Sequence, residues 1–203
     1  MQIGTYSFYK CKQLKTFTVP STVTFIGDGV FNGCSALTDV YLPDGLAGFG
    51  FMTFKDCTAL TEITLPSSFS LIDEFAFAGT GLTGITLSQT VGSIENNAFL
   101  GSDMLTVYTE HTGKPFGWDS SWNASNRPVV WGCTLSADKK YVVSFTKSSS
   151  NIQNPGAANG IKAPYRQGYT FDGWLSAANG QTYPAANVNS APNGNLTALW
   201  TPV

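Results

Sequence analysis

Histidine and charge are both scarce in this chain, and their scarcity narrows the functions open to it. Among 203 residues there is one histidine, His111, with 11 Lys or Arg and 13 Asp or Glu. Binding to a polyphosphate needs a surplus of basic residues on one face, so the net charge of −2 argues against a nucleic-acid partner. His111 has no second histidine, cysteine or nucleophile at a catalytic or metal-ligand spacing, and we interpret it as a surface residue.

Other signatures of chemistry are missing as well. The sequence contains no phosphate-binding P-loop, no Gly-x-Gly-x-x-Gly motif, no calcium loop and no Gly-x-Ser-x-Gly turn. Asp73 and Glu74 are adjacent, but they occupy a turn position and are interpreted as solvated acids. We therefore predict a non-enzymatic protein with no catalytic residue, no metal and no cofactor.

Long apolar runs are also lacking. No window approaches the roughly 18 consecutive apolar residues of a membrane-spanning helix, so we predict no membrane insertion. The opening segment lacks the basic start and apolar run of a signal peptide. Because the chain begins inside a repeat, at Ile3, we expect a longer protein with its export signal upstream. We also expect the uncapped N-terminal end to self-associate end to end.

A repeat of 23 residues occupies the first hundred positions. Phe8 recurs as Phe31 and Phe54, and the pattern Cys-x-x-Leu that follows it recurs with it. A fixed period of about 20 to 29 residues, with Leu-x-x-apolar-x-apolar at its centre, is typical of a stacked solenoid of leucine-rich type. One coil buries too little apolar surface to offset its backbone entropy, so stability must come from stacking.

The repeats divide into five coils of 22 or 23 residues, each with three parts. Alternating segments such as 60–66 (LTEITLP) predict a short parallel strand, ended by a proline that offers no N–H to a ladder. A return limb follows with an inward apolar pair such as Val23 and Ile26. The segment 27–34 (GDGVFNGC) and its equivalents predict a helical turn that buries one phenylalanine. The phenylalanines expected inside are Phe31, Phe54, Phe77 and Phe99. The predicted fold class is an α/β leucine-rich-repeat solenoid.

Three cysteines occupy equivalent positions, at Cys11, Cys34 and Cys57. Neighbouring coils lie about one strand spacing apart, so a disulfide or a metal site is one interpretation. In the next two coils the position is filled by Thr80 and Ser102, which share small size with cysteine but cannot form a disulfide. We favour a narrow inward slot holding a ladder of buried free thiols.

The segments Leu60–Pro66 (LTEITLP) and Ile26–Leu37 (IGDGVFNGCSAL) resemble the BspA-like leucine-rich repeats of bacterial surface proteins. The resemblance covers residues 3 to about 110. The fourth coil departs from it by a deletion at 80–82 and by Ser88 in place of proline. The resemblance implies a curved solenoid displayed outside the cell, often associated with adhesion to host or bacterial surfaces.

We divide the chain into a solenoid at 1–110, a C-terminal cap and linker at 111–137, and a small β-rich domain at 138–203. The cap segment breaks the period and concentrates Trp118, Trp122 and Trp131. One interpretation of these aromatics is a platform for a sugar. The other is a cover for the apolar cross-section of the last coil, and we favour this cap because large aromatics are an efficient cover.

The last 66 residues carry five basic and two acidic side chains, against six and eleven before them, which supports a separate module. The segments Pro164–Trp174 (PYRQGYTFDGW) and Leu196–Trp200 (LTALW) resemble the Listeria–Bacteroides repeat, the B-repeat of internalin-type surface proteins. Residues 147–160 depart from it, since the usual Asn-Gly-Gly run is absent. The resemblance implies a fold similar to a β-grasp and a spacer role near the cell wall.

The outward side chains of the predicted strands form the surface on which we expect binding. They are Thr16, Thr18, Asp39, Tyr41, Glu62, Thr64, Gly84 and Thr86. Only Tyr41 belongs to the residue types that dominate interface hot spots, and the threonines either bind a polar ligand or simply suit exposed strands. Our hypothesis is a cell-surface adhesion module that binds a host or bacterial surface protein or glycan. The alternative is a structural spacer without a ligand.

Overall fold

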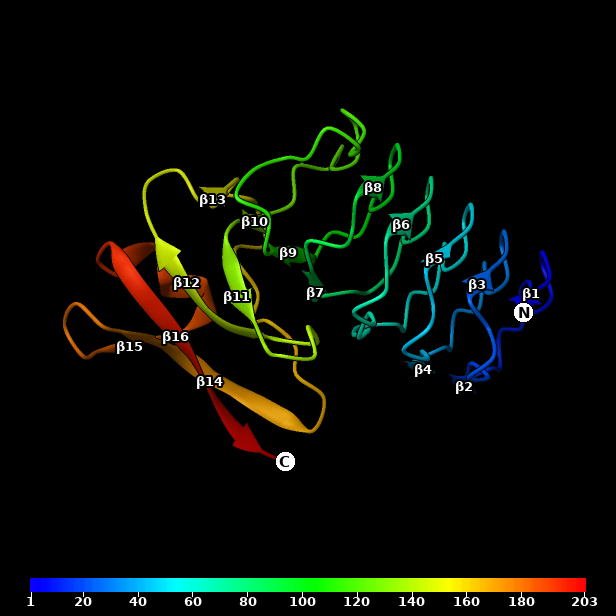
Figure 1. The fold of residues 1–203 in the computed structure, drawn as a ribbon, viewed down its shortest axis with the longest axis horizontal. Helices are drawn as coiled ribbons and strands as arrows, with labels where there is room; N and C mark the ends of the chain where they lie inside the picture. The colour runs from blue at the N-terminus through cyan, green and yellow to red at the C-terminus, as the bar shows by residue number, and fades with distance from the viewer.

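Successive coils of the repeat lie side by side and build an open, elongated solenoid, to which a β-rich module is attached at the C-terminal end (Figure 1). The structure is a computed structural model and describes residues 1–203. It contains no α-helix, and its one helical element is the 3₁₀ turn η1 (Ala185–Ser190). No helix is long and apolar enough to cross a bilayer. The strands of the coils are β1 (Gln2–Ile3), β2 (Thr16–Thr18), β3 (Phe25–Ile26), β4 (Asp39–Tyr41), β5 (Gly48–Phe49), β6 (Leu71–Ile72), β7 (Gly84–Leu87), β8 (Ser93–Ile94), β9 (Thr106–Thr109) and β10 (Val129–Val130).

The return limbs form a continuous parallel sheet in the order β1-β3-β5-β6-β8. Its register places Ile3, Ile26, Phe49, Ile72 and Ile94 in one column. The last four of these side chains are fully buried. The predicted inward pair of the return limb is therefore confirmed.

A stack of phenylalanine rings runs through the solenoid interior. The rings of Phe8, Phe31, Phe54, Phe77 and Phe99 are nearly parallel, with successive centroids 5.2–5.7 Å apart. All except Phe8, which lies in the first coil, are almost completely buried. The predicted ladder of equivalent side chains is confirmed, and it fills the centre of a core of 32 buried residues.

The prediction that 27–34 and its equivalents form helical turns is wrong. The amide of Phe31 donates to the carbonyl of Thr53 at 2.9 Å, and that of Gly33 donates to Lys55 at 2.8 Å, so these groups bond to the next coil and not within a helix. Each turn also contains left-handed residues, such as Gly29 and Gly33 at φ +57° and +76°. Left-handed residues interrupt a right-handed helix, so the segment alternates short turns with bonds to its neighbour.

The small-residue slot is a hydrogen-bond position as well as a packing position. The thiols of Cys34 and Cys57 donate to the carbonyls of Phe8 and Phe31 at 3.0 and 3.1 Å. The Ser102 hydroxyl donates in the same way to the preceding coil. Burial raises the pKa values of the Cys34 and Cys57 thiols. The expected burial is confirmed for these two cysteines, but Cys11 is exposed because it lies in the first coil.

The solenoid has six turns and not five. Trp118 forms a parallel bridge with Ile94, where the next return strand is expected. The chain then passes through turns to β10, which pairs in parallel with β9. Residues 117–130 thus complete a sixth turn, which the irregular spacing of the sequence conceals.

The C-terminal module is a five-stranded antiparallel sheet in the order β11-β12-β16-β14-β15. Its long strands are β14 and β16, which pair through most of their length. A further short strand, β13, pairs antiparallel with β10 of the solenoid. The module strands are β11 (Cys133–Leu135), β12 (Val142–Lys147), β13 (Ile152–Gln153), β14 (Tyr169–Ser176), β15 (Thr182–Tyr183) and β16 (Gly194–Pro202).

The stacked rings generate a prediction about stability. Phe54→Ala removes a buried ring with a neighbour on each side and should lower the free energy of unfolding by about 3–5 kcal/mol. Phe8→Ala, in the partly exposed first coil, should cost less than half as much. Urea unfolding followed by circular dichroism measures both variants. Equal losses would contradict a core built by stacking.

Candidate functional site

The strand face of the solenoid, made by the outward residues of β2, β4, segment 60–66, β7 and β9, is open over the first three coils and covered over the next two. Thr16, Thr18, Asp39, Tyr41 and Glu62 are exposed, and Thr64 is half-buried. Gly84 is buried and Thr86 half-buried. The equivalent residues of the fifth coil, Thr106 and Tyr108, are fully buried.

The covering segment is residues 161–165 of the C-terminal module. The Lys162 amide donates to Thr106 Oγ1 at 2.8 Å, and the Tyr108 hydroxyl donates to the Lys162 carbonyl. The chain passes so close to Gly84 that a Cβ there would lie 2.9 Å from the Ala163 carbonyl oxygen. Tyr108 also belongs to the hydrophobic core of the module. The module is thus packed directly on the strand face.

A cleft forms where the open part of the strand face meets the module. The solenoid contributes Asp39, Tyr41, Glu62 and Thr64, four of the predicted binding residues, and the structure brings them together here. Thr16, Thr18 and Thr86 do not line the cleft. The module contributes Lys140, Tyr165 and Gln167. The cleft volume is about 120 Å³, enough for a side chain or one sugar ring but not for a large cofactor.

The third coil shapes the cleft by departing from the predicted structure. Segment 60–66 was expected to form a strand, but no strand is present there, and the sheet of β2 and β4 is separate from that of β7 and β9. The inward residues Ile63 and Leu65 are nevertheless buried. Inward and outward side chains therefore still alternate along the segment, although it lacks the hydrogen bonds of a strand. Its outward residues Glu62 and Thr64 line the cleft.

The electrostatics of the cleft are dominated by carboxylates. Asp44 pairs with Lys140 at 3.3 Å, whereas Asp39 and Glu62 have no Lys, Arg or His within 4.0 Å. Partial burial raises the pKa of Glu62, and Asp39 adds to the rise, while the Tyr165 hydroxyl acts in the opposite direction. Burial and the Glu62 charge raise the pKa of Tyr165 to about 12. The cleft is therefore an acidic, partly solvent-exposed site beside Tyr41 and Tyr165.

The predicted cap aromatics lie inside the solenoid. Trp118, Trp122 and Trp131 are 1%, 4% and 5% exposed and pack on one another and on Phe99. Such burial leaves no ring face for a sugar and supports the cap. His111 is half-buried, with its ring 5.3 Å from that of Trp118, so it lies at the surface but packs against the cap.

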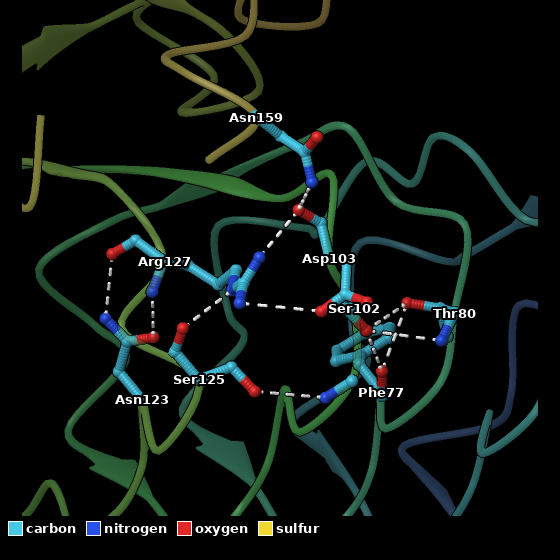
Figure 2. Close-up of polar contacts among 9 residues, drawn as sticks. Phe77, Thr80, Ser102, Asp103, Asn123, Ser125, Arg127 and Asn159 are labelled. Atoms are coloured by element: carbon cyan, nitrogen blue, oxygen red, sulfur yellow. Dashed lines mark hydrogen bonds and ion pairs between the residues drawn. The ribbon is translucent and has the colours of Figure 1, made fainter. Parts of the chain in front are cut away.

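Arg127 fastens the sixth turn to the fifth coil (Figure 2). Its Nη1 donates to the Asp103 carbonyl at 2.7 Å and its Nε donates to Ser125 at 3.0 Å. The Asn123 side chain donates its Nδ2 to the Arg127 carbonyl and accepts the Arg127 N–H at its Oδ1. Asn159 of the module donates to the same Asp103 carbonyl at 2.8 Å. Arg127 thus joins the sixth turn to the fifth coil and Asn159 joins the module to it, and we assign these side chains a structural role.

The sequence interpretation missed Lys140, Tyr165 and Gln167, because they lie in a module that was expected to stand apart from the solenoid. One signal of the contact was present. Gly84 occupies a position that holds Thr16, Asp39 or Glu62 in the preceding coils. A glycine among side chains in a strand often marks the close approach of another backbone.

Gly84→Thr restores the side chain typical of the column and tests the docking contact. The new Cβ would meet the Ala163 carbonyl, so we expect a loss of roughly 1–3 kcal/mol in unfolding free energy. Hydrogen exchange of residues 161–165 should also become faster. Gly113→Thr is the matched control, since nothing lies within 4 Å of its Cβ position. Unchanged exchange in Gly84→Thr would contradict the packing described.

Glu62→Gln tests the electrostatics of the cleft. The pKa of Glu62 is raised in the folded state, so the ionised form at pH 7 destabilises the fold, and this penalty disappears below the unfolded pKa of about 4.3. The variant should unfold about 1–2 °C higher at pH 7 and unchanged at pH 3. A lower midpoint at pH 7, or a difference that persists at pH 3, would contradict this account.

Comparison with known proteins finds solved structures that are similar to the solenoid. No curated protein sequence matches the chain. A solved leucine-rich repeat protein from T. pallidum is 30% identical with a TM-score of 0.50, over 53% of this chain and 51% of that one. A leucine-rich repeat protein from Bacteroides ovatus is 31% identical with a TM-score of 0.53, over 59% of this chain and 30% of that one. The chain thus spans about half or less of each relative.

The description of one family fits most of the solenoid. The profile named BspA type leucine rich repeat region matches residues 1–112 in six copies, more than half of the chain. The match ends at residue 112, before the sixth turn at 117–130 begins. The chain therefore belongs to the BspA-type leucine-rich repeat family.

Proposed function

We propose that this protein is a non-enzymatic binding module displayed on a bacterial cell surface. Its solenoid engages a surface protein or glycan of host or bacterial origin through the strand-face cleft. The observation that carries the proposal is the cleft itself, where Asp39, Tyr41 and Glu62 of the open strand face meet Tyr165 of the docked module.

The composition of the cleft suits recognition better than chemistry. Tyr41 is 47% exposed, and tyrosine is one of the residue types enriched in interface hot spots. The unpaired carboxylates of Asp39 and Glu62 accept hydrogen bonds from hydroxyl, amide or ammonium groups of a partner. The lining contains no histidine and no cysteine, the side chains that most often activate or act as nucleophiles.

The C-terminal module contributes a wall to the site and also serves as a spacer. Its aromatic motif at 164–174 and its strand at 196–200 support a B-repeat-like, β-grasp-like domain. Its contacts with Thr106, Tyr108 and Gly84 fix its position relative to the solenoid. A rigid junction presents the cleft in a fixed direction and reduces the entropy lost on binding.

Family membership supports the proposed location. BspA-type repeats resemble those of bacterial surface proteins, and both solved relatives are leucine-rich repeat proteins of bacteria. A solenoid offers an extended surface and no deep pocket, which suits a macromolecular partner.

A binding array tests the proposal. The whole chain is screened against extracellular-matrix proteins and glycans, and the hits are repeated with the triple variant Asp39→Ala, Tyr41→Ala, Glu62→Ala. We expect saturable binding that weakens at least tenfold in the triple variant. Phe116→Ala, which removes a fully exposed aromatic outside the cleft, is the control and should bind normally. Absence of any saturable binding would favour the structural spacer instead.

A further inference from the structure

A second open surface lies on the turn limb of the first three coils, away from the strand face. A groove there has a volume of about 660 Å³. Tyr6 and Tyr9, on its first wall, are 47% and 45% exposed, and neither belongs to the hydrophobic core or packs against it. The lining residues are Tyr6, Tyr9, Lys10, Asn32, Gly33, Met52, Lys55 and Asp56.

Two glycines of the second coil leave room for side chains of the first coil at this end of the groove. The ring of Tyr6 lies against Gly29, so that a Cβ at Gly29 would be 2.1 Å from the ring. Lys10 lies over Gly33 in the same way, with its Cγ 3.0 Å from the Cβ position. The second coil therefore has no side chain at these two points. Side chains of the first coil lie over its backbone instead.

The residues that line the groove combine aromatic faces with polar donors. The rings of Tyr6 and Tyr9 are perpendicular, with centroids 5.5 Å apart, so they offer two surfaces at an angle. Asn32 and Lys55 follow Tyr9 at equivalent positions of the next two coils. Aromatic faces that pack on the apolar side of a ring, with a few polar groups to fix its orientation, are features of small-ligand sites.

The groove is positively charged within an acidic solenoid. The first coil carries Lys10, Lys12 and Lys15, and no acidic residue precedes Asp28. Lys10 and Lys55 have no carboxylate within 4.0 Å. The one acid of the lining, Asp56, is directed toward the fourth coil, where its Oδ1 lies 2.6 Å from the Cβ position of Gly79. Lys10 Nζ lies 4.9 Å from the centroid of the Tyr9 ring and Lys55 Nζ lies 5.7 Å from that of Phe75. Both ammonium groups thus contact aromatic rings, and neither is neutralised by a carboxylate.

We propose that this groove binds an acidic saccharide. A sugar ring packs on Tyr9 and Tyr6, and its carboxylate or sulfate group pairs with Lys10 and Lys55. The groove volume lies within the range of about 300–1,000 Å³ usual for ligand sites. The site is separate from the strand-face cleft, so each can fail without the other.

Isothermal titration of the whole chain with two acidic probes tests the proposal. The probes are a hyaluronan hexasaccharide, which carries carboxylates, and a heparin hexasaccharide, which carries sulfates as well. Saturable binding of either probe, weakened by salt, is expected, and the neutral probe chitohexaose should bind at least tenfold more weakly.

Variants locate the site. Tyr9→Ala should weaken binding at least tenfold, and Lys55→Gln about threefold with a smaller salt dependence. Both residues lie outside the core, so the fold should persist, which circular dichroism checks. Phe116→Ala removes an aromatic outside the groove and should bind as the parent does.

Three results would overturn the proposal. The first is no saturable binding of either acidic hexasaccharide. The second is unchanged affinity in Tyr9→Ala. The third is equal or tighter binding of a hexaglutamate peptide, which would show that the groove recognises acidic protein segments and not saccharides.

Discussion

The lateral stacking of coils is the constraint on which the whole structure depends. Each coil satisfies its turn amides with carbonyls of the next coil, as Phe31 does with Thr53, and it buries its phenylalanine between the rings on either side. Neither contribution exists in an isolated coil, whose backbone entropy then exceeds its apolar burial. The buried tryptophans of the sixth turn and the docked module extend the same logic, since they cover the last apolar layer and pair its free strand.

Stacking also explains how one scaffold carries different surfaces. Inward positions are fixed by packing, so variation is confined to outward columns, where a change in one coil alters the surface locally. On the strand face, Gly84 occupies the position that holds Thr16, Asp39 and Glu62 in the earlier coils. Because glycine has no side chain, the module can pack there. On the turn limb, Gly29 admits the ring of Tyr6. Glycines at outward positions thus mark the places where something else approaches the backbone.

The periodic part of the fold could be predicted from the sequence, because its determinants repeat. Phe31, Phe54 and Phe77 were correctly placed in one stack, and the return-limb column was correctly placed inside. The turns could not be predicted, because their amides bond to a neighbouring coil and local patterns resemble those of a helix. The sixth turn was hidden by irregular spacing before Trp118. The cleft was half predicted: its solenoid residues share a strand face, but Tyr165 is about a hundred residues away from Glu62 in sequence, and no local pattern encodes that contact.

The most direct test of the stacked solenoid is a nuclear Overhauser experiment on the aromatic rings of Phe31, Phe54 and Phe77, with assigned side chains. The structure places the rings of Phe31 and Phe54 5.2 Å apart and those of Phe54 and Phe77 5.5 Å apart. It predicts cross-peaks for both of these pairs and none between Phe31 and Phe77, which are separated by a whole coil. Missing cross-peaks for the adjacent pairs, or a direct one between Phe31 and Phe77, would contradict the account.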